Sequence, residues 1–463
     1  MNKKAELIFI PSPGVGHLAS SVEAAKLLLD RDNRLSISVI IFNRSSDSKL
    51  TNYTDSLTTT DRFRLFNISV DSDSNLGFGF IQTKKPQVKE AVSDLISTSG
   101  LPLAGFVLDM FCTSMMDVAA EFGVPSYFFF TSSAAFLGFK FHLQFLHDEH
   151  QVDPTQYKDS DAVLDFPTLV KPLPARVLPT VVLQKEWLPF FLDHARAIRK
   201  ARGIIVNTFT DLECHAVTAL SEGKNPPVYP VGPILNLGSD ESNGQKNVII
   251  DWLDDQPALS VVFLCFGSMG SFNVEQVKEI ACALEHSKHR FLWSLRRPSG
   301  DEKKMEYPTD YENLEEVLPI GFMDRTAEIG KIIGWAPQTE ILRHPSIGGF
   351  VSHCGWNSTL ESIRYGVPIA TWPIYAEQQL NAFQLVEELE LGVEIKMDYR
   401  KENDVIVKAE EIERGIRCVM EHDSKVRTNV KEMSEKSKTT LMEGGSSLSI
   451  LRRFIEDVMD NVP

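Results

Sequence analysis

The side chains with the clearest chemical potential are gathered within residues 335–378. This stretch begins with the run WAPQ at 335–338, continues with HCGWNS at 353–358 and closes with Glu377 and Gln378. An indole can stack on a flat base, an imidazole beside a tight turn can bind a phosphate, and carboxylate and amide groups can bind vicinal sugar hydroxyls. The combination predicts a site for a sugar nucleotide.

The central turn of this stretch predicts a phosphate site at the start of a helix. His353 follows a short apolar run that predicts a buried strand, and Gly355 permits a tight turn before a helix that begins near Asn357. The first N–H groups of a helix are unpaired and lie at the positive end of its dipole, which suits a diphosphate. Ser358 and Glu361 also match a capping box, so a purely structural role for these two residues stays open.

A second pair of chemically suited residues lies nearer the N-terminus. His17 stands in the run PSPGVGHL, which follows one predicted strand and opens a helix, and Asp109 ends another predicted strand. An imidazole titrates near neutrality and can take a proton from a hydroxyl, while a carboxylate can fix its tautomer and stabilise its cation. Taken singly, His17 could be a solvated helix start and Asp109 a helix cap. The glycines at 14 and 16 match a dinucleotide motif only in part, because its third glycine is missing.

These residues need a scaffold of parallel strands. Short apolar runs alternate with helical patterns in both halves of the chain, which predicts doubly wound α/β domains that bind ligands at the carboxyl ends of their strands. The polar run at 236–247 predicts a linker. We therefore expect a first domain at 1–240, a second at 248–443 and a C-terminal helix at 444–463. The predicted strands are 7–11, 35–42, 105–109, 126–130 and 203–207 in the first domain and 260–266, 290–294, 331–334, 349–352 and 369–372 in the second.

Composition limits the class of protein. The 463 residues are 43% hydrophobic and 24% charged, as is typical of soluble globular domains, and the net charge of −16 disfavours a nucleic-acid partner. Six cysteines lie far apart without a CxxC motif, which favours free thiols in a reducing cytoplasm. The N-terminal apolar run is short for a secretory signal, and Pro125 interrupts the uncharged stretch 122–139. We expect a cytoplasmic protein without stable membrane insertion.

The sequence resembles the plant family-1 UDP-glycosyltransferases over its whole length. The resemblance rests on the 335–378 box with its unbroken HCGWNS core, on the positions of His17 and Asp109, and on the runs FIPSPGVGHL, VGPIL and WPIYAEQQLNAF, which look like the branch that glucosylates small phenolics. It implies the GT-B fold, in which two Rossmann-like doubly wound domains face a cleft and a C-terminal helix returns to the first domain. Glu377 is a mild departure from the aspartate that many members carry at this place.

The resemblance implies roles for individual residues. It makes His17 the general base and Asp109 its support, and a terminal glutamine at position 378 points to UDP-glucose. Aromatic side chains around Thr131 predict an apolar acceptor pocket. The expected donor-binding residues are Thr131, Ser268, Trp335, Ala336, Gln338, His353, Trp356, Asn357, Ser358, Glu361, Glu377 and Gln378, and the expected acceptor-pocket residues are Gly14, Phe111, Phe136, Phe139, Trp187 and Phe191.

The implied reaction is a direct displacement. His17 deprotonates a hydroxyl of a flavonoid, stilbene, other phenolic or terpenoid acceptor, and the oxygen attacks the anomeric carbon opposite UDP, so that inversion gives a β-O-glucoside. Diphosphate leaves toward His353, Ser268 and the helix start, an electrostatic set that could replace a divalent cation. We expect no metal and no cofactor, since His344 and His353 have poor ligand spacing. We expect a monomer whose partners are the UDP-sugar and the acceptor.

Three other classes share parts of this pattern. A dinucleotide-dependent oxidoreductase would share the doubly wound domains but leave the 335–378 box unexplained, and calorimetry with NAD and UDP separates the two. A sugar-nucleotide-binding protein without catalysis would keep the box and lack the base, and turnover separates it. A scaffold protein would bind neither nucleotide. Within the favoured class, a UDP-sugar other than UDP-glucose also stays open.

Overall fold

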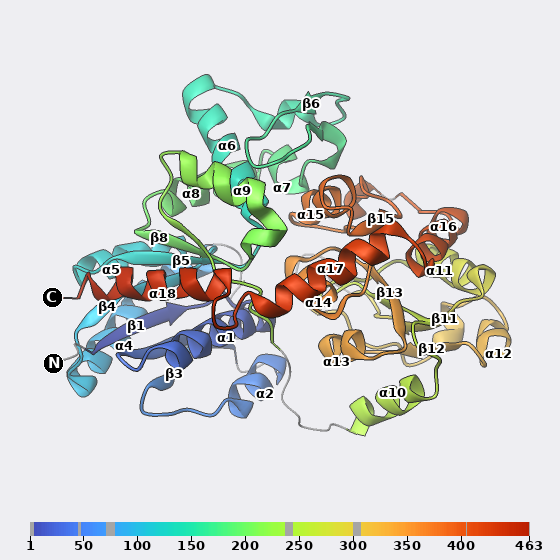
Figure 1. The fold of residues 1–463 in the computed structure, drawn as a ribbon, viewed down its shortest axis with the longest axis horizontal. Coiled ribbons are helices and arrows are strands. Elements are labelled where there is room, and N and C mark those ends of the chain that lie inside the picture. The colour runs from blue at the N-terminus through green and yellow to red at the C-terminus, as the bar shows by residue number, and fades with distance from the viewer. Residues whose placement is uncertain are drawn as a thin grey trace. The chain divides into compact units, whose positions relative to one another are not determined.

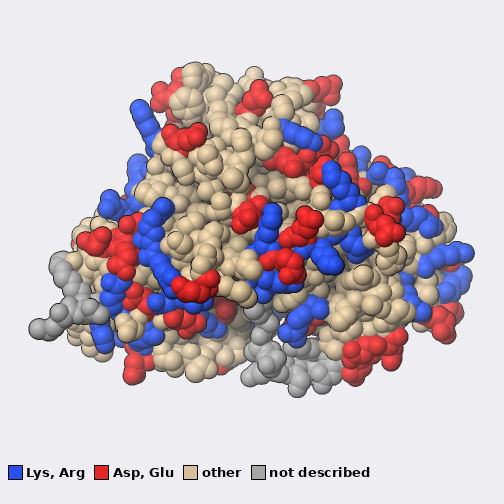
Figure 2. Space-filling model, viewed as in Figure 1, with Lys and Arg blue, Asp and Glu red and all other residues tan. Residues whose placement is uncertain are grey.

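The computed structural model describes residues 4–44, 48–70, 79–236, 244–299, 307–403 and 405–462. The chain forms two compact units, and each is built on a parallel sheet covered by helices (Figure 1). The first unit contains Met1–Val152, Pro189–Asn236 and Thr439–Pro463, and the second contains Asp153–Leu188 and Leu237–Lys438. On the face drawn in Figure 2, acidic and basic side chains are interspersed, so the net charge is not collected in one patch there.

The first unit has seven parallel strands in the order β3-β2-β1-β4-β5-β8-β9. The strand order reverses beside β1, so the segments that follow β1 and β4 leave the sheet at neighbouring carboxyl ends. All six residues of β1 are buried, because helices cover both faces of the sheet, and this burial explains the continuous apolar run. The strands are β1 Ala5–Ile10, β2 Leu35–Arg44, β3 Phe63–Val70, β4 Leu103–Asp109, β5 Ser126–Phe130, β8 Gly203–Val206 and β9 Val228–Pro230, and the helices are α1 Val15–Arg31, α2 Ser48–Ser56, α3 Phe80–Thr83, α4 Lys85–Ser99, α5 Met116–Glu121, α6 Ala134–His150, α8 Leu188–Ile198, α9 Thr210–Glu222 and α18 Ser446–Met459.

The second unit repeats the plan with six parallel strands in the order β12-β11-β10-β13-β14-β15. Here the order reverses between β10 and β13, which again places two strand exits side by side. The strands are β10 Val261–Cys265, β11 Arg290–Ser294, β12 Gly330–Ile333, β13 Ile347–Ser352, β14 Ile369–Thr371 and β15 Gly392–Glu394, with the short pair β6 Val163–Leu164 and β7 Leu173–Pro174, and the helices are α7 Thr180–Leu183, α10 Gly244–Asp254, α11 Val274–Ser287, α12 Phe322–Thr326, α13 Gln338–Arg343, α14 Trp356–Tyr365, α15 Gln378–Phe383, α16 Ala409–Met420 and α17 Lys425–Thr439.

The C-terminal helix completes the core of the first unit. α18 contacts α1, β4 and β9, and its apolar face joins the same buried cluster as the strands of the first sheet (Figure 1). Phe454 is fully buried and packs edge-on against Tyr127 and Tyr229, at 5.2 Å between ring centroids in both cases. The Tyr229 hydroxyl donates to Asp457. The expected return of the C-terminal helix to the first domain is therefore confirmed.

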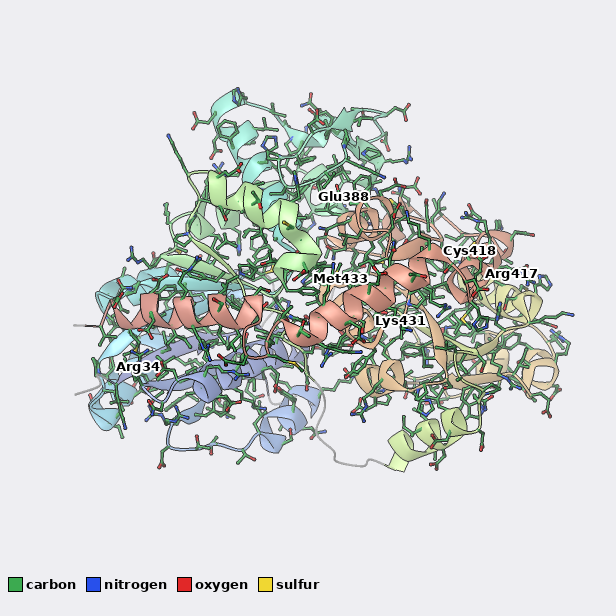
Figure 3. All side chains as sticks on the ribbon, in the orientation of Figure 1. Arg34, Glu388, Arg417, Cys418, Lys431 and Met433 are labelled. Carbon is green, nitrogen blue, oxygen red and sulfur yellow. The ribbon has the colours of Figure 1, made fainter. Side chains whose placement is uncertain are left out.

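The segment 153–188 was expected in the first domain but packs with the second unit. Glu388, labelled in Figure 3, accepts hydrogen bonds through Oε1 from the backbone N–H groups of Val170 at 2.7 Å and Lys171 at 2.9 Å. Arg400 donates to the carbonyl of Leu178 at 2.6 Å. Each of these pairs joins residues more than 200 positions apart. Composition along the chain carries no sign of such pairings, which is why the segment was assigned with its sequence neighbours.

The strands predicted from apolar runs are all present, with ends displaced by at most two residues. Three strands of the two parallel sheets, β3, β9 and β15, and the two-residue strands β6 and β7 were not predicted. Of the three in the parallel sheets, β3 lies at an edge of the first sheet and mixes buried with exposed residues, and β9 and β15 are the shortest, with only three residues each. Most of the expected linker, residues 237–243, lies outside the described residues, and α10 begins at Gly244.

Candidate active site

The neighbouring exits of β1 and β4 bring His17 and Asp109 into contact. His17 Nδ1 lies 2.8 Å from Asp109 Oδ2, the carboxylate is fully buried, and the imidazole is about one-third exposed. His17 is the third residue of α1, which begins after Gly14 at φ 116°, a value that glycine adopts without strain. An N–H at Nδ1 that donates to the carboxylate makes Nε2 the basic nitrogen of the ring. The arrangement therefore suits a general base.

The second oxygen of Asp109 is held by groups that the sequence analysis did not single out. The backbone N–H of Phe111 donates to Oδ1 at 3.1 Å, and the buried hydroxyl of Ser12 donates to the same oxygen. Thr131 follows β5, and its Oγ1 lies 3.3 Å from His17 Nδ1. The structure thus groups three predicted site residues, and Ser12 joins them because the run PSPGVGHL turns directly after β1.

An aromatic cluster lies beside the imidazole of His17. The Phe111 ring is 5.5 Å from the His17 ring in an edge-on arrangement, and it also stacks against Phe190 at 6.5 Å. His194 packs on Phe190 at 4.0 Å and donates through Nδ1 to the carbonyl of Met110 at 3.0 Å. Burial lowers the pKa of His194 to about 4, so this ring is neutral at physiological pH. Phe190 lies between the expected pocket residues Trp187 and Phe191. His194 was not predicted, because a single aromatic residue on a helix usually belongs to a core.

The other expected acceptor residues lie apart from this contact. Phe136, Phe139 and Phe191 are buried and pack on one another at 6.0 to 6.3 Å between ring centroids. This is the geometry of a packed core. Trp187 is exposed and belongs to the segment that packs with the second unit.

In the second unit, the exits of β10 and β13 meet at His353. Gly267 follows β10 with φ +73°, and a Cβ at this position would lie 2.5 Å from His353 Nε2. A Cβ at Gly355 would lie 2.6 Å from the same nitrogen, so two glycine backbones enclose the imidazole. Burial lowers the pKa of His353 to about 4, and Nδ1 has no hydrogen-bond partner within the described part of the chain. A neutral ring with an unsatisfied buried nitrogen suits a hydrogen bond to a ligand.

The start of α14 decides between the two interpretations of Ser358 and Glu361. The helix begins at Trp356 with Gly355 as its N-cap, and this residue has no side chain that could cap the helix. Ser358 therefore lies inside the first turn, and the capping box is not formed. Gln338 Nε2 instead donates to Ser358 Oγ at 2.8 Å and to Glu361 Oε2 at 2.7 Å. Burial raises the pKa of Glu361 to about 7. A helix start that lacks a capping side chain at its N-cap suits an anion.

Trp335 forms an exposed aromatic surface at the exit of β12. Its side chain is 43% exposed, and the guanidinium of Arg296 lies 5.4 Å from the ring centroid. Asp310 accepts from Arg296 Nε at 3.0 Å and holds the guanidinium in place. An exposed indole supported by a cation can stack on a nucleobase. Arg296 could not be predicted as a partner because it follows a different strand, β11.

Glu377 and Gln378 lie where α15 begins. Glu377 is the N-cap of this helix, and Gln378 is buried. Gln378 Oε1 accepts from the backbone N–H groups of Ile374 at 2.9 Å and Tyr375 at 3.0 Å. The side chain can therefore offer a ligand only its amide donors. The sequence predicted an amide that binds sugar hydroxyls but not whether it donates or accepts.

The remaining donor candidates differ in exposure. Ser268 is exposed in the turn after β10, and Ala336 and Asn357 are half-buried. Trp356 is almost fully buried, so its ring packs in the interior. Across the described ranges, no group of three or more His, Cys, Asp and Glu side chains is arranged to hold a metal ion. The described helices include none with the length and apolarity needed to cross a bilayer.

Two Rossmann-like units with polar side chains at their strand exits define an enzyme of the GT-B glycosyltransferase class. Residues 242–438 match the family model described as UDP-glucoronosyl and UDP-glucosyl transferase. A putative UDP-glucose flavonoid 3-O-glucosyltransferase 3 from Fragaria ananassa is 56% identical over 99% of this chain and 100% of its own. The chain belongs to the plant family-1 UDP-glycosyltransferases.

Solved structures agree with this assignment. A UGT transferase from Siraitia grosvenorii in complex with UDP is 50% identical, with a TM-score of 0.90 over 98% of this chain and 100% of that one. UGT71G1 from Medicago truncatula, complexed with UDP-glucose, is 41% identical, with a TM-score of 0.86 over 99% of both chains. The protein is therefore an enzyme that uses a UDP-sugar as its co-substrate.

Proposed function

We propose that this enzyme transfers glucose from UDP-glucose to a hydroxyl of a small phenolic acceptor and produces a β-O-glucoside with inversion. The observation that carries the proposal is the contact of 2.8 Å between His17 Nδ1 and the buried carboxylate of Asp109. The relative from Fragaria ananassa is named for a flavonoid acceptor, and the Medicago truncatula enzyme was solved with UDP-glucose. Both support the choice of substrates.

On the acceptor side, His17 Nε2 takes the hydroxyl proton while Asp109 holds Nδ1–H. The carboxylate stabilises the imidazolium that forms, and the acceptor oxygen attacks C1 of the sugar from the face opposite UDP. Phe111, packed on His17, offers an apolar surface for a flat acceptor ring. We assign this side of the reaction to the first domain.

On the donor side, Trp335 stacks on uracil, and Gln338 and Glu361 bind the ribose hydroxyls. The diphosphate lies against His353 and the start of α14, where N–H groups and the helix dipole stabilise the charge that develops on the leaving group. Glu377 and the amide donors of Gln378 bind the glucose hydroxyls. We assign this side to the second domain and propose that no metal ion is needed.

A turnover assay with UDP-glucose and EDTA tests the proposal. The acceptor panel contains flavonoids, stilbenes, hydroxybenzoates and terpenoid alcohols, and mass spectrometry detects the gain of one hexose. A β-glucoside formed in EDTA supports the proposal. A product that appears only when a divalent ion is added contradicts the metal-free mechanism. Binding of UDP without product from UDP-glucose, followed by product from a different UDP-sugar, moves the assignment to that donor.

We further propose a monomer in the cytoplasm. The six cysteines are free thiols, and three of them are buried, which fits a reducing compartment. Light scattering of the purified protein and cell fractionation test these two statements. A dimer mass or a membrane-bound fraction contradicts the corresponding one.

A further inference from the structure

The carboxylate of Asp109 is a buried charge that needs several donors. Its side chain is fully shielded from solvent, and burying an ionised carboxylate is costly unless hydrogen bonds compensate it. His17 supplies one hydrogen bond, to Oδ2. Oδ1 receives the backbone N–H of Phe111 and the hydroxyl of Ser12. Ser12 is therefore the one side chain besides His17 for which a hydrogen bond to Asp109 is seen within the described residues.

The direction of the Ser12 hydroxyl follows from its neighbours. Cys112 Sγ lies 3.6 Å from Ser12 Oγ, and either atom could donate in that contact. Burial and the charge of Asp109 raise the pKa of the Cys112 thiol well above its usual value, so the thiol keeps its proton and can donate to Ser12. An ionised Asp109 can only accept. The Ser12 proton therefore points to Asp109, and a relay runs from Cys112 through Ser12 and Asp109 to His17.

We propose that Ser12 is a positioning residue that holds the carboxylate of Asp109 turned toward His17. The inference rests on the proposed role of His17 as general base. Because Ser12 stabilises the carboxylate, its loss raises the proton affinity of the His17–Asp109 pair as a whole. The pair then keeps its proton to higher pH, and the acid limb of the kcat/KM profile moves upward.

The groups around Asp109 allow this limb to be assigned. Among the described residues, the charge of Asp109 acts on the titratable groups of Cys112 and His194, and Lys140 acts on His194. The pKa of Cys112 is raised well above 9 and that of His194 is lowered to about 4. Neither titrates between pH 6 and 8, so a limb in that range reports the His17–Asp109 pair.

Ser12→Ala is the test, and Ser38→Ala is its matched control. Ser38 on β2 donates to the buried carboxylate of Glu6 at 2.6 Å, so both variants remove a buried serine hydroxyl from a buried carboxylate in the same unit. For Ser12→Ala we expect the acid limb to rise by about one pH unit and kcat to fall about tenfold, with an unchanged KM for UDP-glucose. Ser38→Ala should keep the wild-type profile. Ser12→Thr keeps a hydroxyl at this position, so its pH profile should be closer to that of the wild type than the profile of Ser12→Ala.

A double-mutant cycle separates positioning from general destabilisation. If Ser12 acts through Asp109, then Ser12→Ala causes no further loss of kcat in an Asp109→Asn background, whereas independent effects multiply. The proposal is overturned if a folded Ser12→Ala enzyme keeps the wild-type profile, or if its loss and that of Asp109→Asn multiply. If Ser12→Ala does not fold, Ser12→Cys in reductant enters the same cycle, with a smaller shift expected. Full activity of His17→Ala instead removes the proposed base, a result distinct from failure of the Ser12 proposal.

Discussion

The imidazole of His353 fills the space that a side chain at Gly267 would need. The two residues are 86 positions apart, yet the hypothetical Cβ of Gly267 would lie 2.5 Å from Nε2 and 2.8 Å from Cε1 of the ring. Such distances force the ring to move. The turn after β10 therefore sets the position of a phosphate-binding candidate that follows β13.

Gly267→Ala should weaken UDP binding at least tenfold, because the displaced His353 can no longer reach the diphosphate. Gly366→Ala is the control, since Gly366 has φ +72° against +73° for Gly267 and its hypothetical Cβ approaches nothing closer than 3.6 Å. Both variants carry the same backbone strain, on the order of 1 kcal/mol. Calorimetric titration with UDP measures the difference. Equal UDP affinity in the two variants would mean that the position of His353 does not matter for binding.

His17→Ala should lower kcat by about 10²- to 10⁴-fold and leave UDP affinity near that of the wild type, because a general base contributes to the transition state and not to nucleotide binding. His147→Ala serves as the control, since His147 forms a similar contact of 3.1 Å with Asp148 on the surface. Steady-state kinetics and UDP titration check both parts. Full activity of His17→Ala excludes this residue as the base.

Gln378→Glu should raise the KM for UDP-glucose about tenfold while the Kd of UDP stays constant. The glutamate keeps an oxygen that accepts from Ile374 and Tyr375, and it replaces the amide donors with a second acceptor oxygen and a buried carboxyl group. Gln378→His should also weaken use of UDP-glucose. In addition, it removes the side-chain oxygen that accepts from the backbone of Ile374 and Tyr375. Donor kinetics for the two variants, with thermal unfolding, separate these effects. An unchanged KM in both means that residue 378 does not contact the sugar.

Glu361→Gln should make the ligand-free protein more stable above pH 7. The pKa of Glu361 rises from 4.5 to about 7 on folding because the carboxyl group is desolvated. A group with a raised pKa stabilises the fold fully below pH 4.5, and this contribution is lost as the pH rises through 7. The variant should therefore gain on the order of 1 to 3 kcal/mol over the wild type at pH 8 and little at pH 5.

Thermal unfolding between pH 5 and 8 checks this expectation. Glu432 is exposed in the middle of α17 and provides the control. Glu432→Gln should show no pH-dependent gain in stability over the wild type. A difference between Glu361→Gln and the wild type that does not grow with pH would contradict the raised pKa.

Phe454→Ala should destabilise the first unit by about 3 to 5 kcal/mol, since it empties a fully buried site between Tyr127 and Tyr229. Arg452→Ala, on the exposed face of the same helix, removes only an ion pair with Glu443 and should leave stability close to that of the wild type. Urea denaturation measures both. Because two units can unfold in separate transitions, the shift is expected in one of them alone.

A strand or helix could be predicted from sequence where its own residues show a clear hydrophobic pattern. Buried parallel strands such as β5 are continuous apolar runs, and α18 lies within the C-terminal helix predicted at 444–463. The positions of His17 and Asp109 at strand exits followed from these runs. What was not predictable depends on pairs of distant residues. Nothing in the local sequence marks Ser12 as a site residue, and its role depends on the position of Asp109 at the end of β4.

The Ser358–Glu361 pair shows a second limit of prediction from sequence. Its spacing fits a capping box. Only the start of α14 at Trp356 shows that Ser358 lies inside the first turn and not at the N-cap position. The choice depends on backbone geometry at a single residue, Gly355. Local sequence rarely fixes a helix end to that accuracy.

The placement of α18 has a consequence for synthesis. The first unit begins to emerge from the ribosome before the second, but the buried side chains of Leu448, Leu451 and Phe454 belong to its core. Its sheet therefore keeps one apolar face incomplete while Leu237–Lys438, most of the second unit, is translated. Loss of α18 would remove buried side chains from the core of the first unit and leave the core of the second unit complete.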